Sequence, residues 1–214
     1  MSDKRAHALL GLPDEEFMQR HPGSNTMTKR EVRAITLANL ELHPHTILWD
    51  IGSGTGSIAI EAARLASMGH VYAIESDTGA LTAIEANCHH FNATNVTIVT
   101  GRAPQILHDL PDPDAIFIGG SGGALSSILE VALARLRHQG YLVINLASFE
   151  HLSEATNYLR KAHWTVNCTL VNIARTQNIL DVTRFAAFNP VFVLTAHAPT
   201  RQEQPLVERS ETDA

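Results

Sequence analysis

Residues 47–56 read ILWDIGSGTG, a short apolar run followed by a loop that contains three glycines. Glycines at such a turn let the backbone bend sharply and approach a ligand that a Cβ atom would block. The next residues, SIAIEAARLAS (57–67), carry apolar side chains at helical spacing, so the loop joins a strand to a helix. A second apolar run, HVYAIE (70–75), ends at Glu75, whose carboxylate can accept hydrogen bonds from ribose hydroxyls. This stretch predicts a binding site for an adenosine-type cofactor.

The same alternation of strand and helix continues along the chain. Three more apolar runs predict strands at 95–99, 115–119 and 141–147, and helical patterns occupy 78–91 and 124–137. Continuous apolar strands indicate a sheet that helices cover on both faces. The sequence therefore predicts an α/β fold, a doubly wound Rossmann-like domain with a largely parallel sheet.

Both ends of this domain add detail. Residues 164–174 and 190–198 are strand-like with no ordinary helix between them, which predicts an antiparallel pair that closes one edge of the sheet. Before the first strand, Thr28 and Glu31 have the spacing of a capping box, which predicts a helix that begins near Thr28.

Length and charge limit the classes of function. A chain of 214 residues suits one domain, which we place at 9–198, with a flexible N-terminus (1–8) and a polar, disordered tail (199–214). The net charge of −6 argues against nucleic-acid binding. No apolar run reaches the roughly 20 residues of a membrane helix, and the first residues lack a secretory signal. Cys88 and Cys168 are far apart, as in a reducing compartment, so we expect a cytoplasmic protein. The histidines lack partners at metal-ligand spacing, so no metal site is predicted.

The glycine loop leaves two cofactor classes open. A dinucleotide loop usually has a third glycine two residues beyond the second, whereas here Ser57 stands at the later position. The spacing D-x-G-x-G-x-G, which begins at Asp50, resembles motif I of the class I S-adenosylmethionine methyltransferases. That family has a seven-stranded sheet that ends in an antiparallel hairpin, as expected from 164–198. The competing interpretation is an NAD-dependent oxidoreductase.

The segment DAIFIGGSGG (114–123) bears on the methyl acceptor. Methyltransferases of base or glutamine amines carry Asn/Asp-Pro-Pro-Tyr/Phe at this place, and this chain has neither the prolines nor the aromatic residue. Bare glycines would let something large come close to the backbone. A flexible turn is the plainer explanation of the same glycines.

Five segments together resemble the cobalamin-pathway precorrin carbon-15 methyltransferases, over about residues 9–197. The resemblance implies S-adenosylmethionine-dependent methylation of a precorrin at carbon 15, with decarboxylation of the ring C acetate. It also implies a homotetramer, and either a free-standing enzyme or half of a fusion with a carbon-5 precorrin methyltransferase. Whether the substrate carries cobalt is left open. The segments are GLPDEEF (11–17), MTKREVRA (27–34), DIGSGTGSIAIE (50–61), IFIGGSGG (116–123) and ARTQNILDVTRFAAFNPVFVLTA (174–196).

The resemblance also assigns roles to individual residues. Glu75 would bind the ribose, Ala103 would lie against the adenine, and no catalytic acid or base is assigned. The expected cofactor-binding residues are Thr28, Gly52, Ser53, Gly54, Thr55, Gly56, Glu75 and Ala103. The expected substrate-binding residues are Gly119, Gly120, Ser121, Gly122, Gly123, Asn145 and Arg175. Asn145 is chosen by its position, because ligands bind at the carboxyl ends of such strands. Arg175 is also chosen by position, and a solvated surface charge is the alternative for it and for each of the following cations. Lys29, Arg30, Arg33 and Arg184 are further candidates for the substrate carboxylates.

Three other functions remain open at this point. The chain could methylate a different acceptor, such as a protein isoaspartyl group, a small phenol or an RNA base. It could be the NAD-dependent oxidoreductase named above, or a non-catalytic domain that kept the fold.

Overall fold

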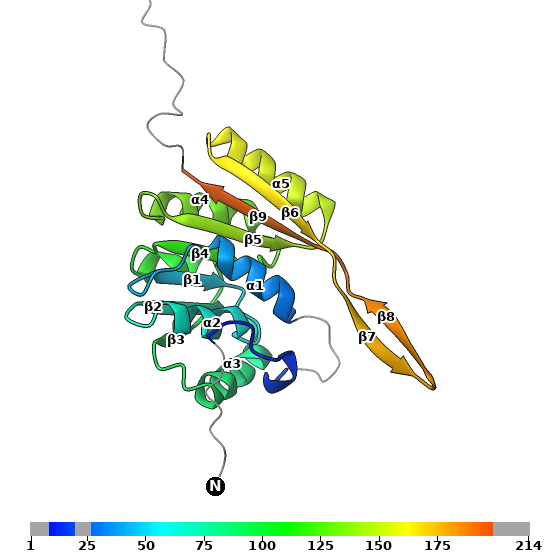
Figure 1. The fold of residues 1–214 in the computed structure, drawn as a ribbon. Coiled ribbons are helices and arrows are strands. Elements are labelled where there is room, and N and C mark those ends of the chain that lie inside the picture. The colour runs from blue at the N-terminus through cyan, green and yellow to red at the C-terminus, as the bar shows by residue number, and fades with distance from the viewer. Residues whose placement is uncertain (1–8, 20–26, 199–214) are drawn as a thin grey trace, which may run out of the picture.

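The computed structural model describes residues 9–19 and 27–198, so the termini predicted to be flexible (1–8 and 199–214) lie outside the described residues (Figure 1). Seven strands form one sheet in the order β3–β2–β1–β4–β5–β9–β6. The strands of this sheet are β1 (Ile47–Ile51), β2 (His70–Glu75), β3 (Val96–Thr100), β4 (Ala115–Ile118), β5 (Tyr141–Leu146), β6 (Thr165–Val171) and β9 (Val191–His197).

Strand direction follows the predicted doubly wound pattern. β1 lies at the centre and pairs in parallel with β2 and with β4, and β3 and β5 continue the parallel sheet outward. β9 is inserted between β5 and β6 and runs antiparallel to both. The predicted seven-stranded sheet with its antiparallel C-terminal pair is therefore confirmed.

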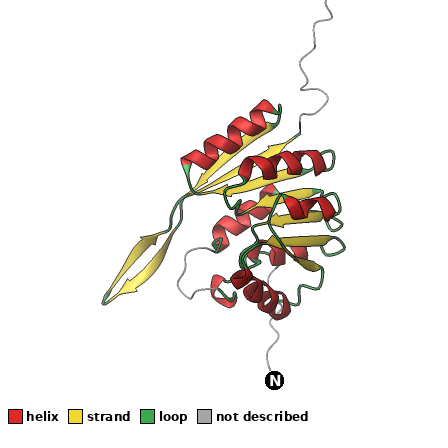
Figure 2. Cartoon of the chain, turned by 180° about the vertical axis from the view of Figure 1, so that it is seen from behind, coloured by secondary structure: helices red, strands yellow, loops and turns green. Residues whose placement is uncertain are grey.

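Helices cover both faces of the sheet, which explains why the central strands are apolar throughout (Figure 2). On one face α1 (Arg30–Asn39) and α2 (Ser57–Leu65) pack against the sheet, and α3 (Thr78–His90) lies along α2 and β3. On the other face lie α4 (Leu125–Arg135), α5 (Phe149–Lys161) and the 3-10 turn η2 (Gln105–Asp109). Because β1 to β5 are parallel, the loops that follow them all emerge along the same side of the sheet, which we call its carboxyl edge.

The N-terminal segment is held by a buried arginine. Leu12 and Phe17 flank the 3-10 turn η1 (Asp14–Glu16) and pack on α2 and α3. Arg33 is 0 % exposed, and its guanidinium bonds Glu61 at 2.7 Å and Asp14 at 2.9 Å. A buried charge needs such partners because removal from water is costly. Arg33 was a candidate for substrate carboxylates, and that prediction is wrong because the residue is fully enclosed.

The predicted capping box at Thr28 is also wrong. α1 begins at Arg30 with Lys29 as its N-cap, and no side chain caps it. Glu31 does not reach back toward Thr28, because its carboxylate accepts from Arg175 Nε at 3.0 Å and Nη2 at 2.6 Å. A partner 144 residues away in the sequence thus replaces the local interaction.

Between β6 and β9 the chain forms a projecting hairpin that the sequence did not reveal. β6 ends at Val171, three residues earlier than expected, and β7 (Ala174–Ile179) pairs only with β8 (Val182–Ala187) in a separate two-stranded sheet. We call residues 174–187 the arm. β9 cannot pair with β7 or β8, because β5 and β6 already occupy both of its edges. Figure 1 shows the arm extending away from the body at the carboxyl edge of the sheet.

Candidate active site

The loop after β1 has the backbone that its glycines predict. Gly52, Gly54 and Gly56 have φ values of 72°, 60° and 76°, a region that residues with a Cβ rarely adopt. Gly56 is the N-cap of α2, and Gly52 N–H donates to Ile74 O at 2.9 Å. The loop therefore turns directly from the central strand into the helix, with its backbone facing the carboxyl edge of the sheet.

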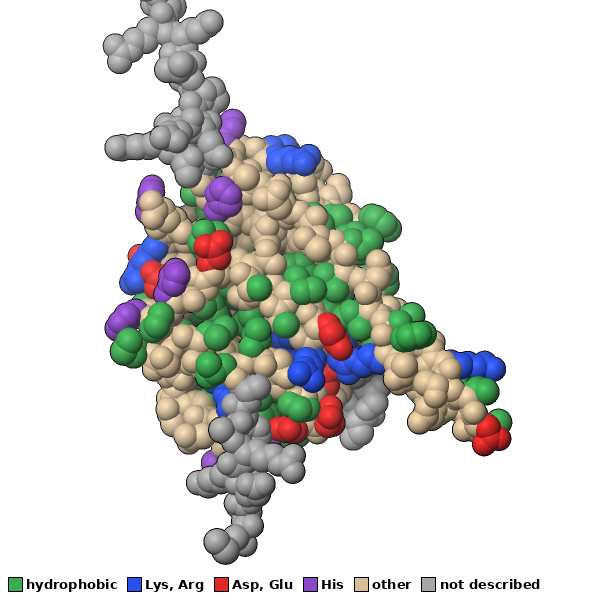
Figure 3. Space-filling view, in the orientation of Figure 1, with side chains coloured by type: hydrophobic (Ala, Val, Ile, Leu, Met, Phe, Trp, Pro, Cys, Tyr) green, Lys and Arg blue, Asp and Glu red, His purple; other side chains and the backbone are tan. Residues whose placement is uncertain are grey.

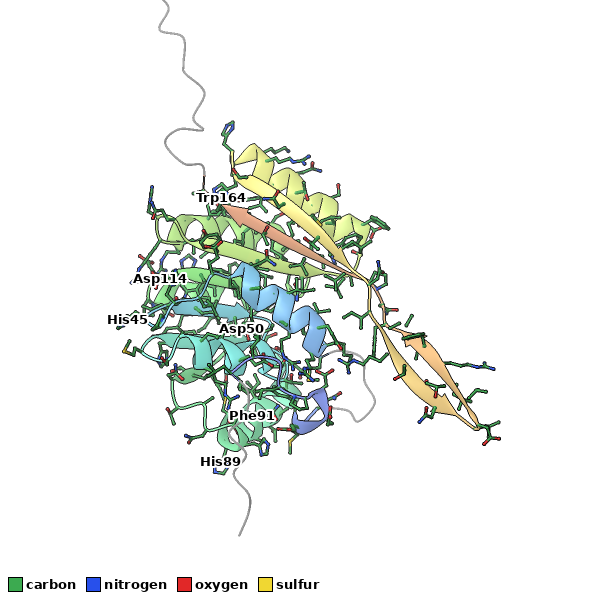
Figure 4. The ribbon with its side chains drawn as sticks, viewed as in Figure 1. His45, Asp50, His89, Phe91, Asp114 and Trp164 are labelled. Atoms are coloured by element: carbon green, nitrogen blue, oxygen red, sulfur yellow. The ribbon has the colours of Figure 1, made fainter. Side chains whose placement is uncertain are left out.

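Asp50 fixes this loop from below. Its side chain is 0 % exposed at the end of β1, inside the body of the domain (Figure 4). Oδ2 accepts from Ser53 Oγ at 2.7 Å and from Ala59 N–H at 3.0 Å, while Oδ1 has no hydrogen-bond partner among the described residues. Burial raises the pKa of Asp50 to about 7, despite the two hydrogen bonds that act in the opposite direction. The negative charge of Glu75 raises this pKa further.

Asn87 on α3 supports the same loop, and the sequence analysis missed it. Its side-chain amide donates to Thr55 O at 2.9 Å and to Met18 O at 3.0 Å. Its Oδ1 accepts from Met18 N–H at 2.7 Å. Asn87 is buried and thus links the glycine loop to the N-terminal segment. A lone amide among the buried alanines of this helix was the available signal, because a buried polar group needs partners.

Glu75 is held rigidly at the end of β2. Oε1 accepts from the N–H groups of Ser76 and Asp77, each at 2.8 Å, and Oε2 accepts from Gly54 N–H at 2.9 Å. A carboxylate has about four acceptor positions, so about one remains for an incoming hydroxyl. The predicted ribose-binding residue is thus orientated before any ligand arrives.

A pocket of about 400 Å³ opens between these loops. Gly52, Glu75 and Ala103 line it, which brings three of the predicted cofactor residues together with the glycine segment after β4. Ser53 points inward to Asp50, and Thr55 bonds Asn87 through its carbonyl, so these two residues shape the loop rather than line the pocket. The remaining lining residues are Ile51, Ile74, Ser76, Gly101, Arg102, Gly120, Ser121, Gly122 and Ile128.

The glycine segment 119–123, here called the ledge, packs directly on the glycine loop. A Cβ built on Gly52 would lie 2.5 Å from Gly120 O, so the two backbones are in contact. A Cβ on Gly119 would lie 2.9 Å from the ring of Phe117. Gly122 and Gly123 have φ values of 55° and 83°, and a Cβ on Gly123 would meet nothing within 4 Å. Close packing explains Gly119, whereas a Cβ on Gly120 would meet only Gly52 Cα, at 3.9 Å. Positive φ in open space explains Gly122 and Gly123.

Other predicted residues lie outside this pocket. Thr28 is half-buried ahead of α1, and its carbonyl accepts from Arg33 at 2.8 Å. Asn145, at the carboxyl end of β5, donates to Thr36 Oγ1 at 2.9 Å. Arg175 at the base of the arm bonds Asp14 at 2.7 Å as well as Glu31. Hydrogen bonding to Arg175 lowers the pKa of Glu31, so this pair is stably charged.

The opposite edge of the sheet has a different character. A hollow of about 1040 Å³ lies there, lined among others by Asp114, Tyr141 and His197. Asp114 and His45 mark this edge in Figure 4, on the far side from the glycine loop. Ligands of parallel α/β sheets bind at the carboxyl ends of the strands, so the smaller pocket is the candidate active site. Within residues 9–19 and 27–198 no cluster of His, Cys, Asp or Glu suits a metal ion.

Comparison with known proteins decides the family. The family model described as precorrin methyltransferase domain matches residues 19–198. The chain belongs to the precorrin methyltransferase family. A probable cobalt-precorrin-6B C(15)-methyltransferase (decarboxylating) of Pyrobaculum calidifontis is 37% identical over 194 residues, which cover 90% of this chain and 98% of that protein.

Two further relatives define the extent of this methyltransferase domain. The crystal structure of a precorrin-6Y C5,15-methyltransferase from Geobacter metallireducens is 38% identical, with a TM-score of 0.85, and covers 90% of this chain and 100% of that one. A precorrin-6Y C(5,15)-methyltransferase (decarboxylating) of a Sinorhizobium species is 36% identical, and the match covers 89% of this chain and 45% of that longer protein.

The cofactor of this methyltransferase fold is S-adenosylmethionine. The residues present fit it, because Gly52, Glu75 and Ala103 line one pocket and Glu75 has an acceptor position beyond its three hydrogen bonds for a sugar hydroxyl. The methyltransferase fold and the S-adenosylmethionine cofactor expected from the glycine loop are thereby confirmed, and the NAD-dependent alternative is dropped. Among the described residues, no helix is long and apolar enough to cross a membrane.

Proposed function

We propose that this protein methylates carbon 15 of a precorrin or cobalt-precorrin and decarboxylates the acetate side chain of ring C, a step of cobalamin biosynthesis. The names of its relatives and the full-length similarity support this substrate class. The observation that carries the proposal is the contact between two bare backbone segments, at Gly52 and Gly120. This contact leaves a side-chain-free surface beside the cofactor pocket, suited to a broad, flat acceptor.

The reaction places modest chemical demands on the protein. S-adenosylmethionine supplies an electrophilic methyl group on a positively charged sulfur. An electron-rich ring carbon attacks that methyl group in line, and the electrons of the broken C–S bond stay on sulfur. Carbon dioxide then leaves the acetate, and its bonding electrons neutralise the positive charge that methyl transfer left on the ring. The former acetate carbon takes up a proton and carbon 15 loses one, so the number of protons on the ring system is unchanged. Positioning of the two reactants supplies much of the acceleration in such a transfer.

The residues of the chain divide this positioning between them. The glycine loop and Glu75 would hold the nucleoside, with Ala103 against its base and Thr28 at its far end. The ledge from Gly119 to Gly123 would support the ring through its exposed backbone. Asn145 and Arg175 would contact the acceptor from the neighbouring strand and from the base of the arm. No general acid is assigned.

The test is incubation of the enzyme with labelled S-adenosylmethionine and either precorrin-6B or cobalt-precorrin-6B. We expect a product that has gained one methyl group and lost one carbon dioxide, and the faster of the two substrates identifies the pathway. Calorimetry should detect binding of S-adenosylhomocysteine and none of NAD. Methylation of a phenol, a peptide or RNA, with no turnover of either precorrin, would refute the proposal.

We propose further that the protein is a homotetramer assembled through the arm. The arm exposes apolar side chains in water, with Leu180 97% and Phe185 77% exposed and Ile179 and Val182 about half exposed. An isolated two-stranded hairpin is marginally stable in water, and its unpaired edges invite pairing with another chain. Figure 3 shows charged side chains where the arm joins the body, the region of the Arg175 ion pairs, and both apolar and charged side chains toward the tip of the arm.

Sedimentation equilibrium tests the assembly. The double substitution Leu180→Ser and Phe185→Ser should convert a tetramer to smaller species, because it removes apolar area from the proposed interface. Met68→Ser is the matched control, since Met68 is exposed on the body far from the arm in sequence. A wild-type monomer, or a tetramer that survives the double substitution, would contradict the proposal.

A functional partner follows from the longer relative. The match to less than half of the Sinorhizobium protein supports a carbon-5 precorrin methyltransferase as the partner of this chain. Co-purification of the two proteins would test this partnership. We also propose a cytoplasmic location, supported by the two free cysteines, Cys88 and Cys168. Cell fractionation would test it.

A further inference from the structure

Arg102 crosses the mouth of the candidate active site. It follows β3 in the segment Gly101–Ala103, and it lines the pocket together with Glu75 on one side and Gly122 on the other. Its Nη2 donates to Gly122 O at 2.9 Å. β3 and β4 are three places apart in the sheet, roughly 14 Å at the spacing of neighbouring strands. One side chain therefore bridges loops that come from distant strands.

The backbone of Arg102 is well anchored, although its side chain is exposed. Gly101 N–H donates to Glu75 O at 3.0 Å and continues the sheet, and Ala103 is buried in the hydrophobic core. Ile106 N–H donates to Arg102 O at 3.3 Å at the start of η2. Because the backbone of Arg102 is anchored on both sides, the hydrogen bond of its guanidinium restrains the ledge rather than the loop after β3.

The ledge needs such a restraint along its outer half. Its first two amides, of Gly119 and Gly120, both point to Ile51 O, at 2.9 Å and 3.4 Å. Beyond Gly120 the two glycines at 122 and 123 are exposed and have positive φ, where glycine gives the backbone wide freedom. The Arg102 bond lies at this outer half, at Gly122.

We propose that Arg102 is a positioning residue for methyl transfer, which ties the ledge to the cofactor-binding side of the pocket and so places the acceptor against the methyl group. The role rests on the proposed function and deepens it. A cofactor bound in the pocket would favour the hydrogen bond between Arg102 and Gly122, because both residues line the pocket that the cofactor fills. Among the described residues Arg102 uses one N–H group, in its bond to Gly122, and the others could bind a substrate carboxylate in the geometry that arginine offers.

Amide hydrogen exchange tests the bridge directly. In the wild type, S-adenosylhomocysteine should slow exchange both in the glycine loop (52–56) and in the ledge (119–123). In Arg102→Met the ligand should still slow exchange in the loop, but it should slow exchange in the ledge less than in the wild type, because the bond that holds Gly122 is gone. Equal protection of the ledge in the variant would overturn the role of Arg102. Protection of neither segment in the wild type would instead overturn the proposed cofactor site.

Steady-state kinetics supply a second test. A purely structural role of Arg102 would not change KM for the precorrin while leaving the affinity for S-adenosylhomocysteine unchanged. Loss of the bridge should raise KM for the precorrin by about five- to tenfold, the effect of one ordinary hydrogen bond, with S-adenosylhomocysteine affinity within twofold of wild type. Arg102→Lys, which keeps a single donor, should recover part of the loss. Arg160→Met on α5 is the control and should match wild type. An unchanged KM in Arg102→Met, or equal losses for both ligands, would overturn the proposal.

Discussion

Substitution of Gly52 by alanine probes the contact on which the site depends. The new Cβ would lie 2.5 Å from Gly120 O and 2.6 Å from Gly120 N, both backbone atoms that cannot swing aside. The residue would also keep a φ of 72°, which costs a non-glycine residue about 1–2 kcal/mol. Overpacking adds about 1–3 kcal/mol. We therefore expect Gly52→Ala to lower the free energy of unfolding by about 2–5 kcal/mol.

Gly54→Ala is the matched comparison for this measurement. Gly54 has a similar φ of 60°, but a Cβ there would meet nothing within 4 Å. Its expected loss is therefore the strain alone, about 1–2 kcal/mol. Urea denaturation of both variants without cofactor, at one pH, gives the two values. Equal losses would show that the loop and the ledge are not in contact, and the reasoning about the acceptor surface would fail.

Three further changes test the charged groups. The pKa of Asp50 is about 7 in the folded protein against an ordinary value of 3.8, so the folded state binds this proton more tightly than the unfolded state does. The stabilisation that results is complete below pH 3.8 and is lost as the pH rises through 7. Asp50→Asn should therefore gain about 3 kcal/mol relative to wild type between pH 5 and pH 8 in urea denaturation, and parallel profiles would contradict this. Arg33→Met leaves Glu61 buried without its cation, while Asp14 keeps its ion pair with Arg175, and should cost about 3–5 kcal/mol in the same assay. A loss under about 1 kcal/mol would exclude a buried ion pair. Glu75→Gln should weaken S-adenosylhomocysteine binding about tenfold or more by calorimetry, since a charged acceptor is lost, and unchanged affinity would remove Glu75 from the site.

The central strands were predictable because one physical signal dominates them. Residues 47–51 and 70–75 are strands within the bounds expected from their continuous apolar pattern. The glycine loop was equally predictable. Positive φ at Gly52, Gly54 and Gly56 favours glycine, and the three glycines are visible in the sequence. Local sequence is sufficient where burial on both faces or backbone geometry selects the residue type.

Long-range ion pairs defeated the prediction elsewhere. Glu31 looked like half of a capping box, but its carboxylate goes to Arg175, and nothing near Glu31 in the sequence reveals that partner. Arg33 resembled a surface cation until the fold enclosed it between Asp14 and Glu61. The arm was missed because its apolar side chains are exposed, so they follow no pattern of burial within this chain.

The reversed direction of β9 has a consequence for any assembly. Because β9 starts at the end of the sheet where β6 finishes, the chain between them must leave the sheet on the side that carries the loops of the candidate active site. Had β9 run parallel, that excursion would have crossed to the far edge. If neighbouring copies bind the arm as proposed, they would lie close to the opening through which the acceptor enters. The oligomer would then help to enclose the active site.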